Sequence, residues 1–242
     1  MMNNLKIDSI FIRISAFLMV LHSCGNSAEE NIPARETSRF LNTDARLVYQ
    51  IYQPTAINPE TIAIDSLFVQ VAYELKPERL LIIGKSLRDY PDGLKLLLVN
   101  PLADYKLLYR SRGAWESWIL HPTLFKVDKP DLPLVILAAQ GTSDSWGQQV
   151  FIMESDSIIE IGFMDVTRKE QADTSFYEGG FRLTDIGPFT EITSSGKGLE
   201  FRFKTDSVFY YGRIGEQVDI TFAGDALEYF YDGDSLRMVL KK

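Results

Sequence analysis

The chain has 242 residues, of which 45% are hydrophobic and 12% aromatic, and it carries a formal net charge of −8 at pH 7. This composition supports a sizeable core and excludes a chain that is disordered throughout. An acidic chain without a basic run lacks the cationic surface on which binding to phosphate backbones depends, so we expect no nucleic-acid partner. With one cysteine the chain cannot form an internal disulfide, and its stability must come from packing.

The first predicted element is a secretory leader. Basic residues precede a short apolar run, Ile14–Leu21, and Cys24, the only cysteine, follows closely. A basic start, an apolar stretch of about 7–15 residues and a small residue before the cut are typical of signal peptides. The tetrad Leu21-His22-Ser23-Cys24 resembles the lipobox of bacterial lipoproteins, a family that is cleaved before the cysteine and lipidated on it. The resemblance implies a signal peptide over residues 1–23 and lipidation of Cys24.

Residues 24–44 are predicted to form a polar tether between the lipidated cysteine and a folded domain, because they show no sustained periodicity. The acidic pair Glu29-Glu30 resembles a short signal by which some bacteria with two membranes send lipoproteins to the cell surface. The resemblance implies an outer-membrane location and favours the surface face over the periplasmic face. We expect the membrane to be reached through the lipid anchor alone, since no polybasic segment is present to attract anionic lipid.

Residues 45–242 are predicted to form a mainly β globular domain. Apolar and polar residues alternate over Leu67–Leu75, which is typical of a half-buried strand. Short apolar runs between turn signals predict further strands, and Leu94–Val99 is either a buried strand or a helix fragment. The spacing favours an antiparallel meander that forms a sandwich, a barrel or a propeller-like sheet with few helices. The other predicted strands are Leu80–Ile83, Lys106–Arg110, Ala114–Leu120, Leu134–Ala138, Val150–Glu154, Ile158–Gly162, Glu200–Lys204, Val208–Tyr211, Val218–Phe222, Leu227–Tyr231 and Leu236–Leu240.

Two segments interrupt this pattern. The segment 125–133 contains two prolines and is a candidate seam between two halves of the domain, and Thr167–Ser175 is predicted to be a helix or a loop. A short motif of the form small-Asp-small-apolar recurs four times and is typical of turns in which Asp and Ser bond their own backbone. The motifs are centred on Asp156, Asp206, Asp225 and Asp234.

The chain contains few residues of the types that usually carry catalysis or bind metals. Once the leader is removed, His121 is the only histidine and no free thiol remains, which excludes a cysteine nucleophile and zinc sites made from cysteine or paired histidines. Gly141-Thr-Ser143-Asp-Ser145 lacks the last glycine of a nucleophile elbow, and Ser194-Ser-Gly-Lys197 lies in a predicted loop. Asp232-Gly-Asp234 lacks the spacing of a calcium loop. We therefore expect no catalytic residue, no cofactor and no metal, and an enzyme is the less favoured class.

The tryptophans are the candidate ligand-binding residues. Trp115 and Trp118 flank Glu116 in one segment, and Trp146 lies in a polar loop bracketed by glycines. Each ring either anchors the core or forms a stacking surface for a sugar or a peptide. Glu116 is the candidate acid under the alternative that the protein hydrolyses glycans with a pair of carboxylates.

These observations predict a lipid-anchored protein of the bacterial cell envelope that binds or scaffolds an envelope glycan or another envelope protein without catalysis. Two alternatives stay open. One is a carboxylate-based glycan hydrolase, which would need two carboxylates about 5–10 Å apart in a cleft. The other is a solute-capture lipoprotein that serves an outer-membrane transporter. A binding protein of either kind needs an exposed apolar or aromatic surface.

Overall fold

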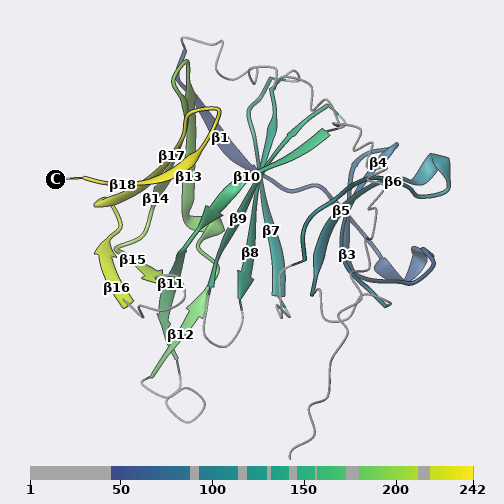
Figure 1. The fold of residues 1–242 in the computed structure, drawn as a ribbon, viewed down its shortest axis with the longest axis horizontal. Coiled ribbons are helices and arrows are strands. Elements are labelled where there is room, and N and C mark those ends of the chain that lie inside the picture. Colours follow the sequence, from purple (N-terminus) through teal and green to yellow (C-terminus); the bar gives the residue numbers. More distant parts are fainter. Residues whose placement is uncertain are drawn as a thin grey trace, which may run out of the picture. The chain divides into compact units, whose positions relative to one another are not determined.

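The computed structural model describes residues 45–87, 93–113, 119–129, 132–141, 146–155, 157–172, 180–211 and 219–241, all within one compact unit, Thr37–Lys242. These residues form antiparallel strands and three short 3-10 helices, with no α-helix among them (Figure 1). The prediction of a mainly β domain is confirmed. In the same part of the chain, no helix has the length and apolar character needed to cross a bilayer.

The strands are β1 (Leu47–Tyr52), β2 (Thr55–Ile57), β3 (Leu67–Lys76), β4 (Arg79–Ser86), β5 (Lys95–Asn100), β6 (Lys106–Arg110), β7 (Ile119–Lys126), β8 (Leu134–Gly141), β9 (Trp146–Glu154), β10 (Ser157–Met164), β11 (Val166–Gln171), β12 (Phe181–Thr184), β13 (Thr190–Ser195), β14 (Gly198–Phe203), β15 (Ser207–Tyr211), β16 (Asp219–Ala223), β17 (Leu227–Tyr231) and β18 (Leu236–Leu240). The 3-10 helices are η2 (Pro59–Thr61), η3 (Pro101–Ala103) and η5 (Gly187–Phe189).

Nine strands form one sheet in the order β10-β9-β8-β7-β1-β13-β14-β17-β18. The sheet curls until its two edge strands, β10 and β18, come into contact. Gly162 lies at a β-bulge of β10, and a Cβ atom at this position would be 3.0 Å from the Cβ of Leu236 on β18. The nine strands therefore enclose a nearly closed barrel, whose edges touch without forming a ladder.

The barrel interior holds the largest of three apolar clusters. It draws on most strands of the nine-stranded sheet, and Val166 of β11 and Val208 of β15 join it. Phe125, Phe201 and Tyr231 are among its largest fully buried side chains. Burial of one such side chain contributes about 1.5–3 kcal/mol, so this cluster is the main source of stability of the barrel.

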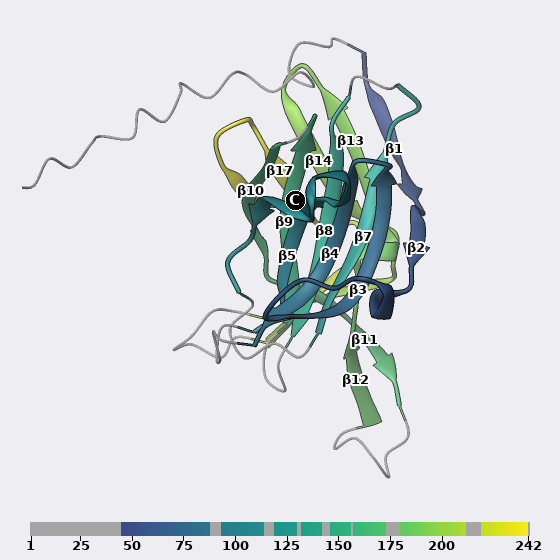
Figure 2. The ribbon, with the colours of Figure 1, turned by 90° about the vertical axis from the view of Figure 1, so that its right-hand side faces the viewer.

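A second sheet covers one wall of the barrel from outside. Strands β2 to β6 form a five-stranded sheet, and its inner face packs against β7, β8 and β9 (Figure 2). Strand β8 is consequently buried on both faces, because Val135 and Leu137 belong to the barrel core while Ile136 and Ala138 contact the second sheet. This arrangement explains the continuous apolar run of β8, which shows no alternation of apolar and polar residues.

The opposite wall of the barrel faces solvent and carries charges. Arg202 of β14 lies 2.8 Å from Glu200 and 3.2 Å from Glu228 of β17, and Lys241 lies 2.7 Å from the same Glu228. Exposed ion pairs of this kind contribute only about 0–1 kcal/mol each. These ion pairs therefore make this face of the barrel hydrophilic and add little to the stability of the fold. Buried side chains alternate with less buried ones along β14 and β17, as expected for strands with one face in the core and one face in solvent.

A four-stranded sheet, β12-β11-β15-β16, extends from the barrel (Figures 1 and 2). The prediction of a helix or loop over Thr167–Ser175 is wrong for its first five residues, which belong to β11. Pairing with β12 and β15 satisfies the backbone of this polar strand. In addition, Arg168 stacks 4.1 Å from the ring centroid of Phe189, and Lys169 lies 3.6 Å from that of Phe209. Cation–π contacts at exposed sites contribute about 0.5–1 kcal/mol each.

Most other predicted strands are present with shifted ends, and Leu94–Val99 corresponds to strand β5. The candidate seam at 125–133 lies where β7 leads into β8, its neighbour in the same sheet. All members of the three apolar clusters lie between Leu47 and Leu236. These clusters therefore lie within the compact unit Thr37–Lys242.

Candidate functional site

Most residues that the sequence singled out lie outside the described part of the chain: Cys24, Trp115, Glu116 and Trp118. Trp146 is described and begins β9, with a half-buried side chain. Its ring lies over Gly141, where a Cβ atom would come within 2.4 Å of a ring carbon. Only glycine fits at position 141 with the indole in this place, so Trp146 packs on the β8–β9 hairpin and keeps part of its surface in solvent.

His121 on β7 belongs to a hydrogen-bonded cluster. Its Nδ1 lies 3.1 Å from Oδ2 of Asp185, and Oδ1 of Asp185 accepts hydrogen bonds from Nε2 of Gln148 at 3.1 Å and from the backbone N–H of Gly187 at 2.7 Å. The hydrogen bond with Asp185 raises the pKa of His121, although partial burial opposes the rise. The cluster connects β7 and β9 to the segment after β12, so its described contacts are those of a structural tie.

The serine–lysine and aspartate motifs have structural roles. Ser194 is buried on β13, whereas Lys197 is exposed in the turn to β14, so the spacing is that of a hairpin. Asp232 accepts hydrogen bonds from the backbone N–H groups of Asp234 and Ser235 at 3.0 Å each, and its other oxygen lies 3.2 Å from Arg237. Nowhere in the described part of the chain do three or more His, Cys, Asp or Glu side chains gather as they would around a metal.

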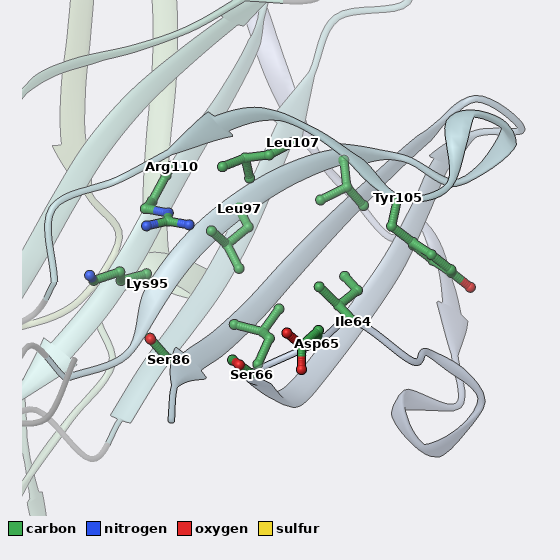
Figure 3. A pocket seen from close by; sticks show the side chains of 11 residues that line it. Ile64, Asp65, Ser66, Ser86, Lys95, Leu97, Tyr105, Leu107 and Arg110 are labelled. Atoms are coloured by element: carbon green, nitrogen blue, oxygen red, sulfur yellow. The ribbon is translucent and has the colours of Figure 1, made fainter. Parts of the chain in front are cut away.

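The candidate site is a pocket of about 290 Å³ on the outer face of the five-stranded sheet (Figure 3). Its floor is apolar, formed by Leu97 and Val99 of β5 and by Leu67 at the start of β3. Gly84 of β4 lies beside the floor, and a Cβ atom there would be 2.8 Å from the backbone oxygen of Phe68 and 3.3 Å from the Leu67 side chain. The missing side chain lets Leu67 lie close against the sheet.

The polar groups of the pocket gather at its two ends. Lys95, Arg110 and Ser86 lie at one end, and Asp65 and Tyr105 lie towards the other (Figure 3). Strand register explains the cationic end. Lys95 pairs with Gly84 and Arg110 pairs with Leu97, so the two cations are diagonal neighbours on the outer face of β5 and β6. Lys95 is buried, at 7% relative exposure, whereas Arg110 is exposed.

Two similar turns shape the walls of the pocket. Asn58 precedes Pro59 at the start of η2, and Asn100 precedes Pro101 at the start of η3. In each turn the asparagine side chain accepts a hydrogen bond from the backbone N–H two residues later, at 3.1 Å and 3.0 Å respectively. The first turn leads into the Ile64–Leu67 wall, and the second leads into Tyr105 and β6.

Both walls contain backbone in the left-handed region. Ser66 has a φ of 61°, and the consecutive residues Asp104 and Tyr105 both have a φ of 53°. Such conformations are uncommon for residues other than glycine and cost about 1–3 kcal/mol each. Strained residues of this kind concentrate at ligand-binding sites, where the surrounding structure holds them in place. Two of the three line the pocket, and the third adjoins it.

This arrangement suits the binding of a small molecule. An apolar floor with a few polar groups at its ends is the usual construction of a small-molecule site, and typical sites measure about 300–1,000 Å³. The pocket is at the lower end of that range, so its occupant must be small. The lining residues supply cations, hydroxyls and one carboxylate, but His121, the described histidine, lies on β7 and not among them.

Sequence reasoning missed this pocket, although one signal was available. Lys95 interrupts the apolar run Leu94–Val99, and a charged residue within a predicted buried strand calls for an explanation. The two Asn-Pro dipeptides also marked turns. Nothing in the sequence showed that both turns lie beside the same face of one sheet, because that depends on the pairing of β3 to β6.

Comparison of the chain with protein-family models, with curated proteins and with solved structures finds no match to any of them.

Proposed function

We propose that the protein is a lipid-anchored solute-binding protein of the bacterial cell envelope, and that its ligand occupies the pocket on the outer face of the five-stranded sheet. The observation that carries the proposal is this pocket, which combines an apolar floor from Leu67, Leu97 and Val99 with polar ends. A concave site of this size accepts a small molecule and not the flat surface of a protein partner. Among the predicted alternatives, solute capture is therefore favoured over scaffolding and over glycan hydrolysis.

The membrane anchor rests on the leader. The tetrad Leu21-His22-Ser23-Cys24 and the basic and apolar segments before it support cleavage and lipidation at Cys24. The polar residues 24–44 would then hold the β domain away from the membrane, with surface display favoured over the periplasmic face. A glycan or protein partner at Trp115, Glu116, Trp118 or Trp146 is not needed for this function.

A neutral fluorescent amphiphile, N-phenyl-1-naphthylamine, tests the pocket without a contribution from charge. We expect saturable binding of one probe per molecule to residues 37–242, and loss of binding in Leu97→Trp, whose indole would fill the floor. Phe181→Trp adds an indole at an exposed position of β12 and should bind the probe like the wild type. Equal binding by the wild type and Leu97→Trp would show that the pocket is not the site.

The anchor is tested in the full chain. A metabolically incorporated palmitate analogue should label the wild type and leave Cys24→Ala unlabelled, and the variant should leave the membrane fraction. Labelling of both proteins would refute lipidation at Cys24.

A further inference from the structure

We infer that the solute is a small uncharged molecule with a mainly hydrocarbon body, and that it binds by extending the apolar cluster on the outer face of the five-stranded sheet. This inference rests on the pocket of the proposed function and adds the chemical class of the ligand. Its supports are the apolar lining of the pocket, the state of its charged groups and its volume.

The pocket lies over the third apolar cluster, which occupies the outer face of the five-stranded sheet. Leu97 and Val99 are buried members of this cluster, and side chains from both walls pack against it. Five of its members also line the pocket, namely Ile64, Leu67, Leu97, Val99 and Tyr105. A ligand on this surface contacts mainly apolar and aromatic side chains, so burial of its own hydrocarbon surface would stabilise the complex.

An exposed leucine continues the same surface. Leu107 of β6 pairs with Val99 and lines the pocket, yet its relative exposure is 43% (Figure 3). Directly paired residues on neighbouring strands share one face of the sheet, so Leu107 extends the apolar floor towards solvent. The hydrocarbon body of a ligand would remove this side chain from water, a gain that a polar ligand would not provide.

The charged groups of the lining do not require a charged ligand. Lys95, Asp65 and Ser86 each already have an interaction partner within the protein. A charged ligand would compete with those interactions and would lose its own hydration on entering the pocket. Arg110 is exposed, and attraction between exposed charges contributes little because water screens it. A charge on the ligand therefore gains little at either end of the pocket.

The volume of the pocket limits the size of the ligand. A cavity of about 150 Å³ accommodates benzene. The pocket measures about 290 Å³, so on the same scale it accommodates a body of about twelve non-hydrogen atoms. Medium-chain alcohols are uncharged molecules of this size with a single polar group, and they represent the class in an experiment.

The test is displacement of N-phenyl-1-naphthylamine from the chain that carries Cys24→Ala, which has no cysteine to lipidate and so needs no membrane. The competitors are hexan-1-ol, octan-1-ol and decan-1-ol, together with octanoate and octylamine as charged molecules of the same chain length as octan-1-ol. We expect the affinity of the alcohols to rise about fourfold with each added methylene group that the pocket buries. Octanoate and octylamine should each bind at least about tenfold more weakly than octan-1-ol.

Two results would overturn the inference. One is binding of octanoate or octylamine as tight as that of octan-1-ol, which would mean that the pocket favours a charged ligand. The other is an affinity that does not change from hexan-1-ol to decan-1-ol, because a hydrocarbon body would then not be recognised. Displacement counts only where Leu97→Trp abolishes it, which excludes binding elsewhere on the chain.

A variant at Leu107 tests the apolar contact directly. Leu107→Gln changes an exposed residue that lies outside the three apolar clusters of the described residues, so folding should be retained. It should weaken the binding of octan-1-ol by about three- to tenfold through lost apolar contact. Leu240→Gln is the matched control, since Leu240 is also an exposed leucine on an edge strand, and it should bind like the wild type. Equal binding by the two variants would show that the ligand does not extend the apolar surface.

The outcomes separate the two proposals. If the probe binds and Leu97→Trp abolishes its binding, but octanoate or octylamine competes as well as octan-1-ol, the solute-binding function stands and the inference of an uncharged ligand fails. If the neutral probe does not bind the pocket, both fail.

Discussion

Among single residues, His121 makes the stability of the protein depend on pH. Its hydrogen bond with Asp185 raises the pKa of the imidazole above the ordinary value of 6.5. Because the folded state has the higher pKa, the pair stabilises the fold fully below about pH 6.5 and loses this contribution as the pH rises through the raised pKa. The His121 side chain is 60% exposed, so solvent screening keeps the contribution below about 1 kcal/mol.

The matching experiment compares the wild type with His121→Gln by urea unfolding. The difference in the free energy of unfolding should be larger at a pH below the ordinary pKa of histidine than at a pH well above the raised one. In an NMR titration, Asp185→Asn should bring the pKa of His121 back towards its ordinary value. An unchanged pKa in Asp185→Asn would show that Asp185 does not cause the shift.

The residue scale also shows what the sequence could and could not reveal. Gly141 and Trp146 were both singled out, but only the register of β8 and β9 shows that the indole covers the glycine. Lys95 lies within the predicted segment Leu94–Val99, but its place beside a pocket was not predicted. Its position beside Arg110, fifteen positions along the chain, is set by strand pairing and not by local sequence.

At the scale of elements, the turn that contains η3 should control the pocket. The Asn100 side chain accepts a hydrogen bond from the N–H of Leu102, and the turn leads directly into Tyr105. Asn100→Ala removes this cap, which should lower the free energy of unfolding by about 0.5–2 kcal/mol. It should also weaken binding of the neutral probe, because the wall that contains Tyr105 loses its support. Urea unfolding and probe titration measure the two effects.

Two variants serve as controls for this turn. Asn100→Asp keeps a side-chain acceptor and should restore most of the stability. Asn58→Ala removes the corresponding cap from η2 and should have a similar cost, since the two turns share the same construction. Identical stabilities of Asn100→Ala and Asn100→Asp would mean that the cap does not matter.

Elements with a clear hydrophobic pattern were predictable, and elements defined by their partners were not. Strands β14 and β17 alternate because one face meets the barrel core and the other meets water, and both were predicted. Strand β11 (VTRKEQ) is polar and carries no such signal. It is extended because β12 and β15 pair with it and because its cations stack on Phe189 and Phe209, contacts made with residues far along the chain.

At the scale of the whole molecule, the sequence predicted an antiparallel β domain but left the sandwich, the barrel and the propeller-like sheet open. The choice depends on where the two edges of the nine-stranded sheet end. They meet beside the bulge of β10 between Glu160 and Gly162, where Gly162 lies against Leu236 of β18. A bulge increases the bend and twist of its strand, so the extra residue in β10 favours the contact between the two edges of the sheet.

A double-mutant cycle on this contact tests the closure. Gly162 has a φ of +147°, a region that favours glycine, and a Cβ atom there would lie 3.0 Å from Leu236. Gly162→Ala should therefore destabilise the protein by about 1–3 kcal/mol through backbone strain and crowding. Leu236→Ala keeps its Cβ atom but removes Cδ2 and Cγ, which would lie 3.2 Å and 3.7 Å from the new Cβ, and alone it should cost about 1–2 kcal/mol through lost burial.

If the edges touch, the double variant Gly162→Ala/Leu236→Ala should be more stable than the sum of the single effects predicts, by about 0.5–1 kcal/mol, because the second change relieves the part of the crowding that comes from Cγ and Cδ2 of Leu236. The part of the cost due to backbone strain should remain. Leu240→Ala, elsewhere on β18, provides the matched control and should add independently to Gly162→Ala. Strict additivity of Gly162→Ala with Leu236→Ala would mean that β10 and β18 do not meet and that the sheet is open, with a barrel core exposed between its edges.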